Sequence, residues 1–268
     1  SDAYFDEDSY LASVNVAHNL ASLYFRAFDE KFIEEIRSYA INYFRKILSN
    51  LGWEPQKSDK HTDALLRTFT ISVLGKMNDD TVTDDAIRKY QKFLKSPSSL
   101  SPDLIETICS IAAWNGNSKT FAELKKLYTN AKTMEEKLRF LGAMCGFQDK
   151  KLLVRTLNFS QTSEVRSQNM QLPIMKVAGN PYGEKVLWPW LKKNWKNINK
   201  KVGHGNPLFN RIVASIAGVA DDSMEKEIKV FFKNNPTPGT ERTQSQTLER
   251  IRINSKFLRT MRKEFKNG

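Results

Sequence analysis

The histidines, which could bind a zinc ion or carry out acid–base catalysis, are few in this 268-residue chain, and they are poorly spaced. The only histidines are His18, His61 and His204. A zinc site on one helix needs two histidines four positions apart, as in His-Glu-x-x-His, because both side chains then lie on one helix face. None of the three histidines is followed by a glutamate or by a second histidine at that distance. The spacing excludes a helix-borne zinc site and leaves only a site assembled from distant positions.

Other catalytic patterns are also missing from the sequence. It has no Gly-rich phosphate loop, no Gly-x-Ser-x-Gly elbow and no Cys-x-x-Cys pair. The paired carboxylates Asp84-Asp85 and Asp221-Asp222 are interpreted as helix starts, where an acid stabilises the positive end of the helix dipole. His61 precedes Thr62-Asp63 near another helix start, which favours a capping or surface role. We therefore predict no catalytic and no metal-binding residue in this chain.

The cysteines and the N-terminal residues bear on the cellular compartment. Cys109 and Cys145 each lie in an apolar helical segment, which predicts free buried thiols in a reducing compartment, with a single disulfide as the alternative. Residues 1–9 contain four acids and no basic stretch, so we expect no signal peptide. No apolar run is long enough for a transmembrane helix. We predict a cytoplasmic protein with no membrane partner.

Helical periodicity dominates the sequence. Apolar residues recur at the i, i+3, i+4, i+7 spacing of an amphipathic helix in Phe32, Ile36, Tyr39, Ala40, Tyr43, Phe44 and Ile47. Helix starts are marked by Ser101-Pro102 and by Thr133 with Glu136, a capping box. Helix ends are marked by Gly116 and by Asn234-Asn235-Pro236. About thirteen helices are expected, and strand signals are nearly absent.

Short connections between these helices imply antiparallel neighbours stacked in sequence order. This predicts an all-α, HEAT/armadillo-like superhelix of helix pairs, with a compact bundle as the alternative, although no strict sequence period is visible. The loops at 54–60 and 236–240 are too short to be domain linkers. A single domain over residues 1–268 is therefore expected, as a fragment of a longer polypeptide.

Several motifs occur in an order that resembles a known domain. The turn Gly179-Asn180-Pro181-Tyr182-Gly183 is followed by a Trp-rich helix that ends in Lys-Lys-Asn-Trp. Leu51-Gly52-Trp53 and Leu65-Leu66-Arg67 lie upstream, and Phe231-Phe232 lies downstream. Together these motifs resemble the C-terminal helical (ERAP-like) domain of zinc aminopeptidases of the aminopeptidase N and tricorn-interacting-factor type. The resemblance extends from about Tyr10 to Arg259.

The resemblance implies a function without catalysis by this chain itself. In such enzymes the C-terminal domain covers the zinc domain, helps to enclose a chamber, and contacts the distal part of peptides whose N-terminal residues are removed. The zinc cofactor would belong to the parent enzyme, because the family's Gly-x-Met-Glu-Asn motif is absent here together with His-Glu-x-x-His. The implied partners are the catalytic domain of the same polypeptide and peptide substrates.

The same resemblance suggests which residues face the peptide. Helix ends that recur along one rim of such a domain would present Trp114, Asn115, Phe147, Gln148, Asn180 and Tyr182. Some relatives carry arginines where this chain has Gly146 and Gly179, and use them to hold the carboxylate of the peptide. Arg139 or Arg166 would have to take this role here, unless both are ordinary structural arginines.

The net charge of +12 raises a second class of function, nucleic-acid binding. Residues 185–201 contain six lysines and no acid, interleaved with Trp188, Trp190 and Trp195. Trp188 and Trp195 follow the 3, 4, 3 spacing of one buried stripe, so we predict that they are structural. Trp190 lies off this stripe and could line a groove. A protein-interaction scaffold is the main alternative function, and nucleic-acid binding is the third.

Arg67 follows two leucines on a strongly apolar helix. A buried arginine usually needs a carboxylate partner, so we predict a structural ion pair. Glu34, Glu35 and Asp63 are the candidate partners.

Overall fold

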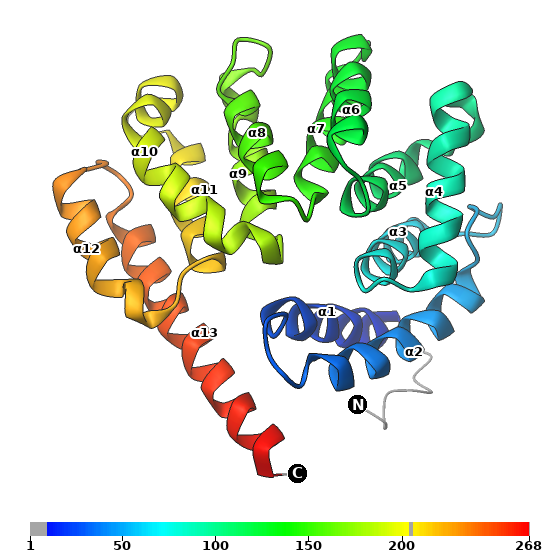
Figure 1. Cartoon of the computed structure of the whole chain (residues 1–268), viewed down its shortest axis with the longest axis horizontal. Helices are drawn as coiled ribbons and strands as arrows, with labels where there is room; N and C mark the ends of the chain where they lie inside the picture. The colour runs from blue at the N-terminus through cyan, green and yellow to red at the C-terminus, as the bar shows by residue number, and fades with distance from the viewer. Residues whose placement is uncertain (1–9, 204–205, 268) are drawn as a thin grey trace. The chain divides into compact units, whose positions relative to one another are not determined.

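The structure is a computed structural model that describes residues 10–203 and 206–267. Within these residues it contains thirteen α-helices, several short 3₁₀ turns and no β-strand (Figure 1). The predicted all-α fold class and the predicted helix number are confirmed. None of the described helices is both long and apolar enough to cross a membrane. Residues 1–9, on which the signal-peptide prediction rests, and His204 lie outside the described residues.

The contacts divide the chain into two compact units, Ser1–Leu127 and Tyr128–Gly268. Their boundary falls inside α6 (Ser118–Asn130). The expectation of one domain over residues 1–268 stays a prediction. The other helices of the first unit are α1 (Tyr10–Arg26), α2 (Ile33–Leu51), α3 (His61–Lys76), α4 (Asp80–Lys95) and α5 (Pro102–Trp114).

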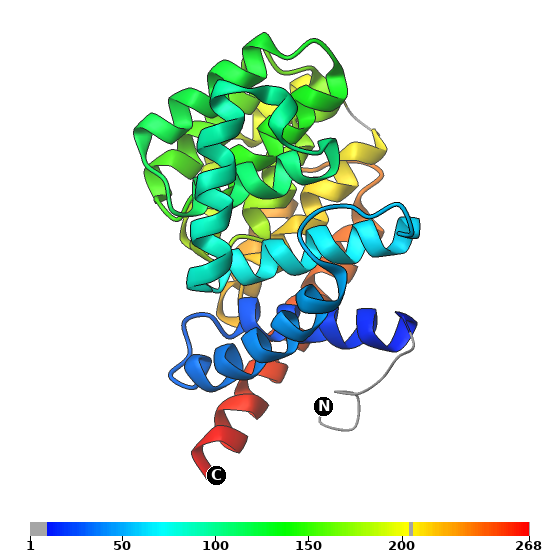
Figure 2. The same ribbon diagram turned by 90° about the vertical axis from the view of Figure 1, so that its right-hand side faces the viewer.

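Helix α3 is the centre of the first unit. It packs against α2, α4 and α5, while α1 covers α2 (Figure 2). Helix α2 contributes the predicted stripe, since Ile36, Ala40 and Phe44 are all buried. Gly75 allows α3 to approach α5, because a Cβ atom at this position would lie 2.6 Å from side-chain carbons of Ile111. The first unit therefore has a core of closely packed helices around α3.

The second unit is built around α9 and α11, which pack against each other. Helix α9 also contacts α7, α8 and α10, and α11 also contacts α13. Figure 1 shows that α13 runs beside α12 and extends past its end. The helices are α7 (Met134–Ala143), α8 (Lys150–Ser160), α9 (Gln171–Ala178), α10 (Glu184–Val202), α11 (Pro207–Ser215), α12 (Glu225–Asn234) and α13 (Glu241–Asn267).

The predicted helix boundaries are mostly confirmed. Thr133 and Glu136 form the capping box at α7, with each side chain accepting a backbone N–H at 3.2 Å. Asp221 precedes a short 3₁₀ turn and accepts the N–H of Ser223 at 2.8 Å. The interpretation of Asp84-Asp85 as a helix start was wrong. Helix α4 begins at Asp80, because Asp79 is already an N-cap, so Asp84 and Asp85 lie in the second turn.

A spatial period that the sequence does not display links the successive helix pairs. Side chains and backbone groups 32 to 37 residues apart are joined by hydrogen bonds, in Asn78–Trp114, Tyr128–Glu164, Asn158–Trp190, Cys145–Asn180 and Ala217–Asn254. Each bond joins one helix pair to the next pair along the chain within a unit. The repeat therefore consists of two helices and their connections, which is the unit expected of stacked helical hairpins.

Candidate functional site

The helix ends predicted to face a peptide are corners held together by polar contacts. In the first unit, Trp114 ends α5 and is only 2% exposed. Its Nε1 donates to Oδ1 of Asn78 at 3.1 Å. Asn78 has φ 55°, a left-handed conformation that asparagine tolerates better than most residues. Arg37 closes the same corner from α2, because its guanidinium donates to the carbonyls of Met77 and Asn78.

Asp79 completes this corner as a buried acid. Its side chain is fully buried, accepts the N–H of Val82 at 2.9 Å and pairs with Nε of Arg45 at 2.6 Å. The sequence analysis missed both Asn78 and Asp79. The available signal was an asparagine followed by two aspartates, which is typical of a left-handed turn leading into a helix N-cap.

The corresponding corner of the second unit is organised by Asn180. Its Nδ2 donates to the carbonyls of Cys145 and Phe147, both at 2.9 Å, and its Oδ1 accepts the N–H of Tyr182 at 2.9 Å. Asn180 is 7% exposed, so these bonds satisfy an amide that is largely removed from water. Asn180 therefore fixes the end of the α7 segment relative to the turn that starts α10.

The six predicted rim residues thus fall into two groups. Trp114, Phe147 and Asn180 are buried, and Phe147 is completely inaccessible. Asn115 is exposed, and Gln148 and Tyr182 are partly exposed. The buried residues hold the corners in place, and only the second group offers side chains to a ligand. Contact with a peptide stays a prediction, narrowed to Asn115, Gln148 and Tyr182.

Arg139 and Arg166 do not lie at these corners. Arg139 is in the middle of α7 and pairs with Glu135 one turn away at 2.6 Å. Arg166 is exposed and lies in the connection between α8 and α9. Helix α8 leads away from the corner at Gln148 over 11 residues, a rise of about 16 Å, so this connection lies at the opposite ends of the helices. Neither arginine is placed to replace a carboxylate-binding residue beside Gly146 or Gly179.

The tryptophans of α10 are structural, as predicted for Trp188 and Trp195. Both are 2% exposed, and their rings meet Phe231 edge to face at 5.1 and 5.2 Å. The suggestion that Trp190 lines a groove was wrong. Trp190 is 6% exposed and donates from Nε1 to Asn158 of α8 at 2.8 Å. Helix α10 is covered on two sides, which a single-stripe interpretation could not anticipate.

Arg67 is a buried structural arginine, but its predicted partners were wrong. Its Nη2 pairs with Asp59 at 2.8 Å and donates to the carbonyl of Leu51 at 2.9 Å. Its Nε donates to the carbonyl of Gly52 at 3.0 Å. A backbone hydrogen bond from Gln56, followed by the Arg67 guanidinium, lowers the pKa of Asp59. The cluster therefore fastens the 52–60 loop to α3.

Two of the three candidate partners of Arg67 are used elsewhere. Asp63 accepts the N–H of Lys60 at 2.8 Å at the start of α3, and Glu34 pairs with Arg37 at 3.1 Å. Both acids are therefore engaged in local contacts one turn away on the chain. Capping and i,i+3 ion pairs, which form between residues close in sequence, compete with ion pairs between distant residues. Arg67 therefore pairs with Asp59 of the loop.

No group of three or more His, Cys, Asp or Glu side chains that could hold a metal ion occurs within residues 10–203 and 206–267. His18 stacks on Phe69 at 4.2 Å, and His61 is the first residue of α3. Cys109 and Cys145 are both free and buried, and burial raises the pKa of the Cys109 thiol strongly. The described side chains do not fit a zinc ion, so no chemical step is assigned to them.

Comparison with known proteins accounts for this architecture. The chain is 29% identical to Aminopeptidase M1-D of Oryza sativa over 97% of its own length and 30% of that protein. It is 27% identical to Aminopeptidase M1 of Arabidopsis thaliana, covering 88% of the chain and 27% of the relative. It is 22% identical to the Alanine/arginine aminopeptidase of Saccharomyces cerevisiae, covering 94% and 30%. The chain thus spans at most 30% of the length of these relatives. Residues 1–253 match the ERAP1-like C-terminal domain, and the chain therefore belongs to this domain family.

Proposed function

We propose that this chain is the non-catalytic C-terminal domain of a zinc-dependent aminopeptidase, where it covers the active site and positions peptide substrates. The observation that carries the proposal is the match of residues 1–253 to a C-terminal domain family whose similar proteins are named aminopeptidases. The catalytic zinc and its ligands would lie in the remainder of the polypeptide. The buried free thiols Cys109 and Cys145 support a reducing, cytoplasmic location.

In this proposal, Gln148 and Tyr182 of the second unit contact the distal part of long peptides, and Asn115 of the first unit is a separate candidate contact. The corners that carry them are held in place by hydrogen bonds, because Asn78 accepts from the indole of Trp114 and the buried Asn180 donates to the carbonyl of Cys145. Rigid placement lowers the entropic cost of holding a flexible peptide. Such contacts lie far from the scissile bond, so they act only on substrates long enough to reach them.

The test compares two substrate lengths in the full-length enzyme. We expect Gln148→Ala/Tyr182→Ala to lower kcat/KM about fivefold to tenfold for peptides of roughly ten residues, since about 1 kcal/mol of binding is removed. A single-residue aminoacyl reporter should be cleaved at an unchanged rate. Ser163→Ala/Arg166→Ala is the matched control, because these exposed residues lie at the opposite ends of the helices.

The possible results separate the interpretations. An equal loss on both substrates would assign the corners to domain closure or stability instead of peptide contact. Unchanged kinetics on both substrates would remove Gln148 and Tyr182 from the peptide-binding surface. A full-length protein without any aminopeptidase turnover would reject the enzyme assignment and favour a protein-interaction scaffold.

A further inference from the structure

One methionine sulfur of the second unit accepts a hydrogen bond. The side-chain amide of Asn169 donates from Nδ2 to the thioether sulfur of Met134 at 3.1 Å. A thioether cannot donate, and it is a weak acceptor. All seven methionines lie in the described part of the chain, and none of the other six has a hydrogen bond to its sulfur there. Met134 is therefore chemically distinct from the other methionines.

This bond joins two segments that are distant in sequence. Met134 is the first residue of α7, and Asn169 ends a 3₁₀ turn in the connection between α8 and α9, residues 161–170. Lys201 and Tyr128 also hold this connection, because the side chain of each donates to one of its carbonyl groups at 2.9 Å. Those two bonds end on carbonyl oxygens, which are strong acceptors, whereas the bond from Asn169 ends on a weak one. The contact at Met134 is therefore the weakest of the three.

Met134 is also accessible to an oxidant in solution. It is partly exposed, whereas Met144 and Met170 of the same unit are completely buried. Cys145, the free thiol of this unit, is only 3% exposed. Oxidation of a sulfur depends on its exposure, so the thioether of Met134 is oxidised before these buried sulfurs.

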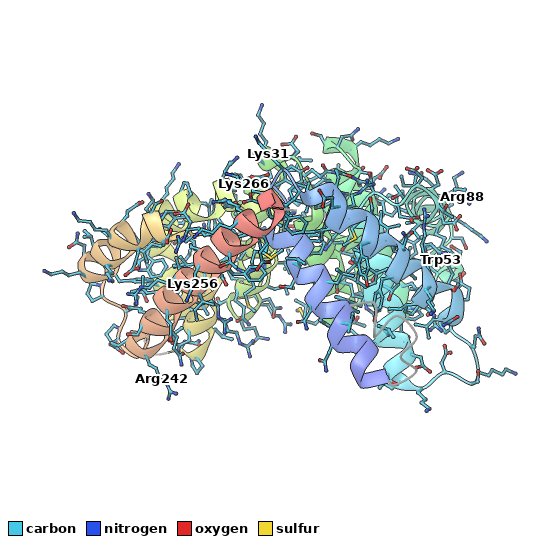
Figure 3. All side chains as sticks on the ribbon, turned by 90° about the horizontal axis from the view of Figure 1, so that it is seen from below. Lys31, Trp53, Arg88, Arg242, Lys256 and Lys266 are labelled. Atoms are coloured by element: carbon cyan, nitrogen blue, oxygen red, sulfur yellow. The ribbon has the colours of Figure 1, made fainter. Side chains whose placement is uncertain are left out.

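The charged groups of this unit do not compete for the oxidant. Residues 128–268 contain 26 Lys and Arg against 12 Asp and Glu, so most of these groups are ammonium or guanidinium ions. Figure 3 shows Arg242, Lys256 and Lys266 along α13 as examples. A cationic nitrogen offers no free lone pair to a peroxide, whereas a thioether sulfur does. The surface side chains that a peroxide oxidises most readily are therefore the methionines Met134, Met175, Met224 and Met261.

Hydrogen peroxide converts a thioether into a sulfoxide in one two-electron step. A sulfur lone pair attacks one peroxide oxygen, an S–O bond forms and the O–O bond breaks, so that sulfur is oxidised and the other oxygen leaves as water with both protons. One sulfur lone pair of Met134 is engaged by Asn169, and the other is free to react. Rotation about the Cγ–Sδ bond then turns the new oxygen toward the amide, because the methionine side chain is flexible.

We propose that Met134 is a reversible oxidation site whose sulfoxide strengthens the link between α7 and the α8–α9 connection. Oxidation of a methionine usually loosens the packing, because the sulfoxide is polar and lacks a partner. At Met134 the amide of Asn169 supplies a donor, so the effect has the opposite sign. A sulfoxide oxygen is a stronger acceptor than a thioether sulfur, and sulfoxide reductases restore the thioether. This site is independent of peptide contact and goes beyond the proposed function.

Hydrogen exchange of the full chain, measured before and after treatment with hydrogen peroxide, tests the proposal. Peptide mapping by mass spectrometry should find the sulfoxide at Met134. Backbone amides of residues 166–170, such as that of Asn169, which donates to the carbonyl of Arg166 at 2.9 Å, report on the 3₁₀ turn. Their exchange should slow about fivefold after oxidation, because one hydrogen bond that holds the turn becomes stronger. Methionine sulfoxide reductase should return the exchange to its original rate.

Three variants separate the site from the other methionines. Met134→Leu cannot be oxidised at this position, and Asn169→Leu cannot donate, so both should lose the slower exchange after peroxide. Met175→Leu is the matched control, because it removes a methionine that is 42% exposed and has no hydrogen bond to its sulfur within the described residues. This control should keep the full effect of oxidation.

Met134→Gln tests the same bond without an oxidant. Its amide oxygen is a strong acceptor on a chain of similar length, so the untreated variant should already show slow exchange in residues 166–170. Adding Asn169→Leu should abolish this effect. Three results would overturn the proposal: faster exchange of residues 166–170 after oxidation, equal slowing in Asn169→Leu, or no sulfoxide at Met134 under conditions that oxidise Met175.

Discussion

Gly179 and Gly183 lie four positions apart, but their surroundings differ. A Cβ atom at Gly183 would lie 1.9 Å from the carbonyl oxygen of Val177, whereas at Gly179 the nearest atom would be 3.6 Å away. Their φ angles of −74° and −89° suit any residue, so only the available space distinguishes them. We expect Gly183→Ala to lower the free energy of unfolding by at least about 2 kcal/mol and Gly179→Ala by less than about 0.5 kcal/mol. Urea denaturation of the chain measures both values, and equal effects would contradict the packing argument.

Single residues also show where sequence reasoning stops. The apolar context of Arg67 indicated burial, and its buried ion pair is present. Its partner could not be predicted, because Asp59 reaches Arg67 only through the path of the 52–60 loop. The turn at Asn180 was similarly evident, but its bonds to Cys145 and Phe147 depend on a neighbour 35 residues earlier. Residue type predicts the need for a partner, and tertiary packing chooses it.

At the scale of elements, α12 and α13 are joined by a carboxylate whose ionisation can be tested. Hydrogen bonds from Arg252 and Lys229 lower the pKa of Glu225 from 4.5 to about 2. Because the folded-state pKa is depressed, this stabilisation is complete above about pH 4.5 and is lost as the pH falls toward 2. We expect Glu225→Gln to lower the thermal unfolding midpoint at pH 7, and the difference should shrink as the pH falls below 4.5.

Glu264→Gln is the matched control for this prediction. Glu264 lies on α13, the helix that carries Arg252, and forms no ion pair within the described residues. Its replacement should leave the midpoint unchanged at every pH. A difference between wild type and Glu225→Gln that does not shrink as the pH falls toward 2 would show that packing, and not ionisation, accounts for the effect.

Helix identity was easier to predict than helix surroundings. The 3.6-residue period, the cap at Thr133 and the proline at the first position of α5 located the elements well. The same period assigns one buried face to each helix, and this fails for α10, where Trp190 is buried off the predicted stripe. A helix covered by neighbours on two sides has two apolar faces that no single periodic pattern separates. Layered packing of this kind becomes visible only in three dimensions.

The repeating character of the whole molecule was predicted, but its period was not. Hydrogen bonds between successive helix pairs, such as Asn78–Trp114 and Asn158–Trp190, recur at separations of 36 and 32 residues. The residue types at these positions differ, because an indole N–H, an amide or a hydroxyl can each bridge neighbouring pairs. When the positions of the contacts repeat but the residue types at those positions do not, the sequence shows no period. The basic composition, which indicated nucleic-acid binding, concerns the surface of the molecule and can be tested directly.

The net charge of +12 leads to an expectation for the entire chain. Lysines 193, 196 and 200 are exposed on α10, but Trp188, Trp190 and Trp195 beside them are buried and cannot stack on bases. Binding to a single strand would then rest on phosphate contacts alone, and log affinity should fall linearly with log salt, with a slope of about −0.7 per phosphate. Fluorescence anisotropy with a labelled single-stranded oligonucleotide should show weak binding that disappears near about 0.15 M salt, where the Debye length is roughly 8 Å. Tight binding that resists salt would require a stacking surface elsewhere and would restore nucleic-acid recognition as a function of this chain.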